Sequence, residues 1–124
     1  MTLRYLHFDH SEATDGTGCF DAMASAGPGA LAALHAELAL VLGWAHRAFP
    51  GGGGPLDEGH PWDEDLQATQ ERTRQEHLVF DPASSRLSAT LAPGESLRHT
   101  VSLSISGTAD FCAAFRARFM AEEA

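Results

Sequence analysis

The chain of 124 residues has the length of one domain, and its apolar content of 44% is ordinary for a globular protein, which argues against wholesale disorder. Acidic residues outnumber basic ones by 17 to 8, and the formal net charge is −9. A surface with this charge repels phosphate groups, so nucleic acids and anionic membranes are disfavoured as partners.

The N-terminal residues predict a strand followed by a loop. Residues 3–10 alternate, with Leu6 and Phe8 on one side and His7 and Asp9 on the other. Residues 11–18 contain Asp-Gly and Thr-Gly turn signals and predict a loop. Residues 20–26 are small and apolar, and they fit either a strand or a short helical turn.

A helix is predicted over residues 28–49, because Pro28 suits the first helical position and apolar residues recur at helical spacing. The stripe consists of Leu31, Leu34, Leu38, Val41, Leu42, Ala45 and Phe49. The glycine-rich segment 50–61 is expected to be a flexible connection. Its glycines follow a helix and lead into acidic residues, so they do not form a phosphate-binding loop.

The second half of the chain predicts consecutive antiparallel strands. Residues 62–75 are ambiguous, with a strand favoured over 63–69. Further strands are expected at 77–80, 86–91 and 97–106, separated by turn sequences, and this order suggests a meander. The side chains expected to face the core from the last two of these strands are Leu87, Ala89, Leu91, Leu97, Val101, Leu103 and Ile105.

Thr108 is a plausible N-cap for a C-terminal helix, whose apolar stripe comprises Phe111, Cys112, Phe115 and Phe119. The acidic tail, Glu122 and Glu123, is expected to fray. The predicted fold class is therefore α+β: an antiparallel sheet of four to five strands with two helices against it, in the order β-α-β-β-β-β-α. One domain, residues 1–124, contains all of these elements.

The densest group of potential metal ligands lies near the N-terminus. His7 and Asp9 are two residues apart, so a strand presents them on the same face, and imidazole with carboxylate suits divalent metals. His10 completes the candidate set only if the strand ends early. Further ligands would come from elsewhere in the chain, with His60, Asp63 and Asp65 as the nearest match.

The sequence offers candidate residues for two kinds of catalysis, although ordinary solvated side chains explain the same residues. Paired carboxylates drawn from Asp9, Asp63, Glu64, Asp65 and Glu71 could support acid–base hydrolysis if a cleft held two of them together. Cys19 in its loop could act as a nucleophile with a histidine partner. No motif of high specificity accompanies either arrangement, and the sequence favours a protein that is not an enzyme.

The remaining candidate is a binding surface. Trp62, Asp65, Gln67 and Thr69 offer an aromatic anchor and polar groups, and an exposed sheet edge can pair with a second copy. The alternative for Trp62 is that it closes the core. The leading hypothesis is a small binding or interaction module that acts as a homodimer, with an unknown protein or small molecule as a further partner. A metal-binding protein or metal-dependent enzyme is the alternative, and no other cofactor is expected.

The cysteines and the termini bear on the compartment. Cys19 and Cys112 belong to no zinc or redox spacing, the N-terminus lacks the pattern of a signal peptide, and no apolar run approaches the roughly 20 residues of a membrane span. We expect a cytoplasmic protein with reduced thiols. The seven histidines add the hypothesis of pH-dependent association.

Overall fold

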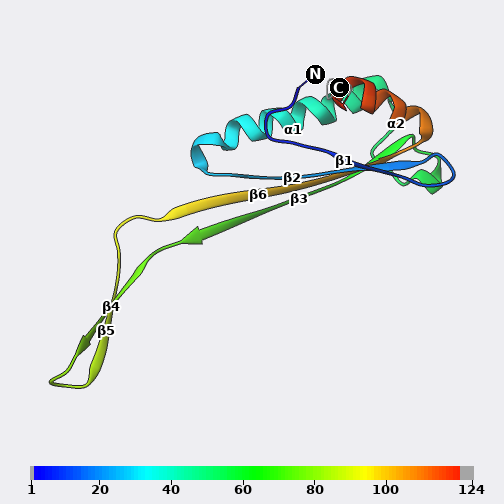
Figure 1. Cartoon of the computed structure of the whole chain (residues 1–124). Helices are drawn as coiled ribbons and strands as arrows, with labels where there is room; N and C mark the ends of the chain where they lie inside the picture. Colours follow the sequence, from blue (N-terminus) through cyan, green and yellow to red (C-terminus); the bar gives the residue numbers. More distant parts are fainter. Residues whose placement is uncertain (1, 121–124) are drawn as a thin grey trace.

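A computed structural model describes residues 2–120, and its elements form an α+β fold with two helices and an antiparallel sheet, as predicted (Figure 1). Glu122 and Glu123 lie outside the described residues. The elements are β1 (Asp9–Glu12), β2 (Gly18–Ala26), α1 (Pro28–Ala48), a short 3₁₀ turn (Leu56–Glu58), β3 (Trp62–Thr73), β4 (Glu76–Asp81), β5 (Arg86–Leu91), β6 (Ser96–Gly107), α2 (Ala109–Phe115) and a π-helical turn that continues it (Arg116–Met120).

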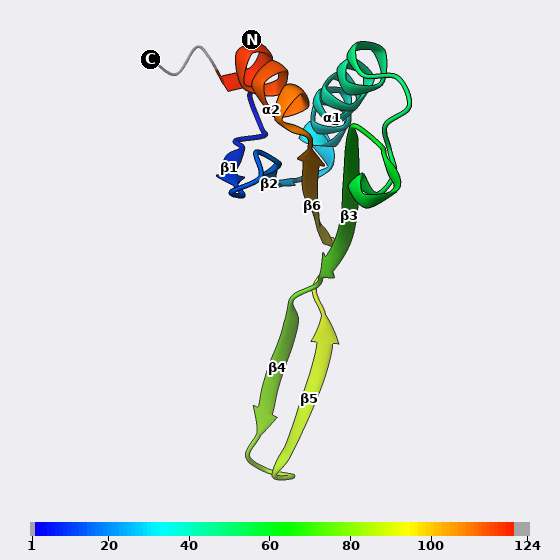
Figure 2. The same ribbon diagram turned by 90° about the vertical axis from the view of Figure 1, so that its right-hand side faces the viewer.

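The main sheet has the strand order β1-β2-β6-β3, and every neighbouring pair is antiparallel. Within residues 2–120, both helices cover one face of this sheet, and the opposite face carries no helix (Figure 2). The predicted meander is wrong. Strand β3 pairs with β6, and β4 pairs with β5 as a separate two-stranded ribbon, so one hairpin is nested inside the other.

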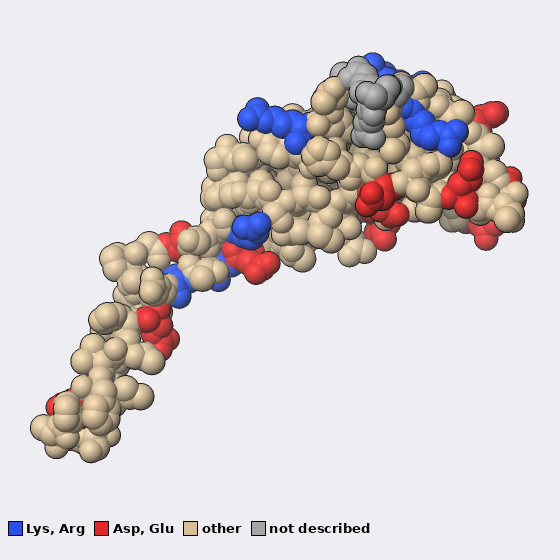
Figure 3. Space-filling model, in the orientation of Figure 1, with Lys and Arg blue, Asp and Glu red and all other residues tan. Residues whose placement is uncertain are grey.

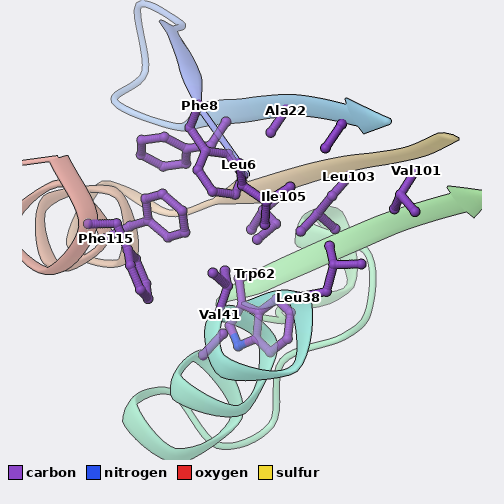
Figure 4. Close-up of a cluster of buried hydrophobic side chains, with 14 of the residues drawn as sticks. Leu6, Phe8, Ala22, Leu38, Val41, Trp62, Val101, Leu103, Ile105 and Phe115 are labelled. Carbon is purple, nitrogen blue, oxygen red and sulfur yellow. The ribbon is translucent and has the colours of Figure 1, made fainter. Parts of the chain in front are cut away.

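The hydrophobic core fills the space between the sheet and the two helices (Figure 4). The α1 stripe contributes Leu34, Leu38, Val41 and Ala45, as its spacing predicts. Alternate residues of β6 contribute Val101, Leu103 and Ile105. By length and composition alone, α1 could cross a membrane, but the core helix of a soluble protein passes the same test.

The C-terminal helix closes one end of the core. Thr108 caps it by accepting a hydrogen bond from the backbone N–H of Phe111 at 3.4 Å, which confirms the predicted cap. Phe111, Cys112 and Phe115 are buried, and the ring of Phe115 stacks on Phe20 with centroids 4.2 Å apart. Cys112 is thus a small core residue.

The first strand begins later than the alternation predicts, because residues 4–6 bond to a side chain and not to a strand. The Glu37 carboxylate on α1 accepts hydrogen bonds from the backbone N–H groups of Arg4, Tyr5 and Leu6 at 2.7 to 2.9 Å. This clamp holds Leu6 and Phe8 in the core, where their predicted burial is confirmed.

Replacing Glu37 by alanine is expected to lower the free energy of unfolding by about 2 kcal/mol, since it leaves three backbone donors without their charged acceptor. Glu37→Gln, which keeps one oxygen acceptor in the same volume, should lose less. Urea denaturation of the wild-type protein and both variants checks this prediction. Equal stability of Glu37→Ala and the wild type would show that the clamp contributes nothing.

Candidate interaction surface

Strands β4 and β5 form an arm that projects away from the sheet and the helices (Figure 1). Every residue of both strands is exposed. Leu87, Ala89 and Leu91 were predicted to face the core, and the structure corrects this: no second layer covers them, and Leu87 exposes 67% of its surface.

The arm is amphipathic. Leu78 pairs with Ala89 and Phe80 with Leu87, so these side chains share one face, because cross-strand partners in an antiparallel pair point the same way. Leu91 continues this face. We call these five residues, Leu78, Phe80, Leu87, Ala89 and Leu91, the apolar face of the arm. The opposite face carries His77, Val79, Asp81, Arg86, Ser88 and Thr90.

Hydrogen bonds and an ion pair order the arm at its tip and at its root. Asp81 orders its tip by accepting hydrogen bonds from Ala83 N–H at 3.0 Å and from Ser84 Oγ at 2.8 Å. At its root, Ala92 N–H donates to the Gln75 carbonyl at 2.8 Å, and Arg72 forms an ion pair with Glu95 at 3.3 Å. These contacts join the arm to the β3–β6 hairpin as one long ribbon.

An isolated two-stranded ribbon is marginally stable in water. Exposed apolar patches of several large side chains mark interaction surfaces in soluble proteins. Phe80, Leu78 and Leu91 each expose more than half of their surface. The apolar face therefore has the character of a surface that a partner covers.

The charge of the chain is distributed unevenly between residues 70–99, which comprise the arm and the adjoining ends of β3 and β6, and the remaining residues. In residues 70–99, Arg72, Arg74, Arg86 and Arg98 balance Glu71, Glu76, Asp81 and Glu95, so the net charge of −9 resides in the remaining residues. In Figure 3 the middle of the ribbon carries both signs and its tip is mostly uncharged. An electrically neutral ribbon can approach an acidic surface without the long-range repulsion that two acidic surfaces experience.

The predicted polar binding face divides between the two sides of the sheet. Asp65, Gln67 and Thr69 lie on the outer face, where Gln67 Nε2 donates to Asp65 at 3.2 Å. Trp62 does not share this face, since it is fully buried in the core and its indole N–H donates to the Phe49 carbonyl at 3.0 Å. Closing the core is thus the observed role of Trp62.

The glycine-rich connection packs around Trp62. A Cβ atom on Gly52 would lie 1.8 Å from the indole nitrogen, so only glycine fits there. Gly53 N–H donates to the Trp62 carbonyl at 2.9 Å. The glycines therefore allow the chain to pass close to the indole ring.

The candidate metal ligands lie on two sides of β1. His7 and Asp9 line one open cavity of about 310 Å³ together with Asp21, which agrees with the predicted shared face. His10 instead stacks on Phe20 with ring centroids 4.6 Å apart. Within residues 2–120, no group of three or more His, Cys, Asp or Glu side chains is arranged to hold a metal ion. The metal hypothesis stays a prediction that elemental analysis would test.

The proposed supplementary ligands have other contacts. His60 Nδ1 lies 2.7 Å from the Gly51 carbonyl oxygen, and the Asp63 carboxylate accepts the N–H of Glu64 at 2.8 Å. Asp65 bonds to Gln67. None of these contacts involves His7 or Asp9.

Two of the carboxylates considered for catalysis, Asp9 and Asp65, lie in one cross-strand row on the outer face, but strands β2 and β6 separate them. The register aligns Asp9 with Asp21, Asp21 with Ser104 and Ser104 with Asp65. Ser104 Oγ donates to the Asp21 carboxylate. Asp9, Asp21 and Ser104 line the open cavity described above, and Asp65 is not among its lining residues, so the cavity does not bring Asp9 and Asp65 together.

The Cys19 thiol lies beside a carboxylate. Its Sγ is 3.6 Å from the Asp21 carboxylate oxygens. Burial raises the pKa of Cys19, and the negative charge of Asp21 raises it further. Since the thiolate is the nucleophilic form, this environment disfavours nucleophilic catalysis.

No family model, curated protein or solved structure matches the chain. Sequence reasoning missed the arm, because alternation places Leu87, Ala89 and Leu91 on one face without showing whether another layer covers that face.

Proposed function

We propose that the protein is an interaction module that forms a homodimer through the apolar face of the arm. The observation that carries this proposal is the exposure of Leu78, Phe80, Leu87 and Leu91 on one face of a projecting ribbon. Large apolar side chains that share one exposed face are expected to be covered by a partner.

The surface area supports a partner of substantial size. The chain exposes 7963 Å². A compact monomer of its mass of 13.2 kDa exposes about 6400 Å². The excess of about 1500 Å² exceeds the ~800 Å² that each partner contributes to a standard interface. Covering the apolar face of the arm would remove part of this excess.

The uneven charge supports a second copy as that partner. Two acidic bodies repel each other, and a neutral ribbon lets two copies make contact through their least charged part. The proposal describes a cytoplasmic protein that acts by binding, without a catalytic step.

The test compares two substitutions on adjacent residues of β4. Phe80→Asp places a carboxylate on the apolar face, and we expect it to raise the dimer dissociation constant about 100-fold, because the change occurs twice in a two-fold dimer. Val79→Asp introduces the same charge on the opposite face, where Val79 is also about half exposed. It should leave the dissociation constant within a few-fold of the wild type.

Sedimentation velocity over a range of protein concentrations measures both constants. Circular dichroism and thermal unfolding serve as the folding control for each variant. Equal effects of the two substitutions would contradict the proposal, since the apolar face would then have no special role in association.

A further inference from the structure

We infer that the apolar face of the arm docks into a groove between α1 and β3 of a second copy, so that two arms are exchanged reciprocally. This inference rests on the proposed homodimer and names the surface that receives the arm. The groove is a cavity of about 360 Å³ on the helix-covered side of the sheet. Its apolar lining residues are Leu38, Ala39, Leu42, Leu66, Ala68 and Val101.

The apolar lining of the groove suits an apolar side chain from a partner. Leu66 exposes 45% of its surface at its rim, and Val101 is buried at its base. A bulky apolar side chain from outside would cover Leu66 and fill space that the helix and the sheet leave open. The apolar face of the arm supplies such side chains, Phe80 above all.

The spacing of the two surfaces along the ribbon matches a two-fold axis. Leu66 and Phe80 are equally far in sequence from Thr73, and so are Ala68 and Leu78. On the other strand of the ribbon, Val101 and Ala89, which pair with Ala68 and Leu78, are equally far in sequence from Glu95. A two-fold axis through the middle of two antiparallel ribbons therefore brings the tip of each over the base of the other.

Alternation along the ribbon is consistent with this arrangement. Leu66 and Ala68 occupy alternate positions of β3, and Leu78 and Phe80 occupy alternate positions of β4, so each pair shares one side of its own strand. The segment between them carries the bases Arg72 and Arg74 and the acids Glu76 and Glu95. The centre of the ribbon thus brings balanced charges together when two ribbons face each other.

Packing of one arm on the other arm alone would cover only the two apolar faces and would leave both grooves open. A standard interface removes about 800 Å² from each partner. Docking of each arm into a groove doubles the number of apolar contact sites, because each copy gives one arm and receives another.

Site-specific disulfide cross-linking tests the inference in the full-length chain. The background variant is Cys19→Ser, which leaves the buried Cys112 as the native thiol. Ala68→Cys places a thiol in the groove, and Leu78→Cys places one on the apolar face. After mixing these two chains under mild oxidation, we expect the 68–78 disulfide to be the main cross-linked product, identified by peptide mass spectrometry.

The control pair is Thr69→Cys with Val79→Cys, which carries thiols on the opposite sides of the two strands and should yield at least tenfold less product. A predominant 78–78 disulfide, or no disulfide in a chain that sediments as a dimer, would overturn the groove and leave the proposed homodimer intact. A wild-type chain that sediments as a monomer would overturn the homodimer itself, and with it the groove.

Discussion

Replacing residues 74–95 by an Asn-Gly turn is expected to yield a folded protein that has lost the ability to dimerise. Thr73 and Ser96 are cross-strand partners at the end of the β3–β6 pairing, so a two-residue turn can join them. The removed segment contributes none of the buried core residues. The remaining protein, with the main sheet and both helices, should therefore retain its secondary structure and unfold cooperatively.

The matched control for this deletion is the full-length Phe80→Asp variant, which is also expected to be monomeric. The unfolding midpoint temperatures of the two monomers should differ by only a few degrees. This comparison separates the stability of the main sheet and the helices from the stabilisation that dimerisation provides. Circular dichroism melts and sedimentation measure the two properties. A deletion variant that still dimerises would place the interface elsewhere, for example on the open edge of β3.

Replacing Trp62 by alanine is expected to destabilise the fold by about 3–5 kcal/mol, the usual cost of removing a fully buried large aromatic side chain. The indole is stacked on Phe111 with ring centroids 5.7 Å apart, and it also contacts the ring of His46. Its removal leaves the Phe49 carbonyl without its donor. Since native domains are stable by only about 5–15 kcal/mol, a large part of the molecules would unfold at 37 °C.

Trp62→Phe is the informative companion variant, because it keeps an aromatic ring in the core and loses only the indole N–H and part of the volume. Its loss in unfolding free energy should be less than half of that of Trp62→Ala. Denaturant titrations of the monomeric Phe80→Asp background measure both without interference from dimerisation. If Trp62→Ala unfolds like the wild type, the assignment of Trp62 to the core is wrong.

Much of the fold was predictable because its signals are local. The α1 stripe, the strand at residues 86–91 and the Thr108 cap follow from spacing and side-chain chemistry, and the structure confirms them. The strand over 63–69 is confirmed as part of a longer one, β3. The undecided segment 20–26 belongs to strand β2.

The arm was not predictable from the same signals. Alternation shows that Leu87, Ala89 and Leu91 share a face, but it does not show whether another layer of the protein covers that face. The local pattern also does not show which distant strands pair, so a nested hairpin and a meander have the same sequence signature. The Glu37 clamp was missed for a similar reason, since its three partners lie more than thirty residues away.

For the candidate sites too, local spacing places neighbouring side chains on one face but does not show which distant residues join them. Two-residue spacing correctly placed His7 and Asp9 on one side, where they line the same cavity with Asp21. It could not bring a third ligand to them, because that depends on the strand order. The polar set Trp62, Asp65, Gln67 and Thr69 mixed residues of opposite parity, and the structure separates Trp62 from the others.

The most direct test of the central claim is the mass of the wild-type chain in solution, measured by analytical ultracentrifugation from low to high micromolar concentration. We expect a species of twice the 13.2 kDa chain mass that predominates at the upper concentrations. In the same experiment, the variant without residues 74–95 should remain a monomer throughout. A wild-type chain that sediments as a 13.2 kDa monomer at every concentration would contradict the account.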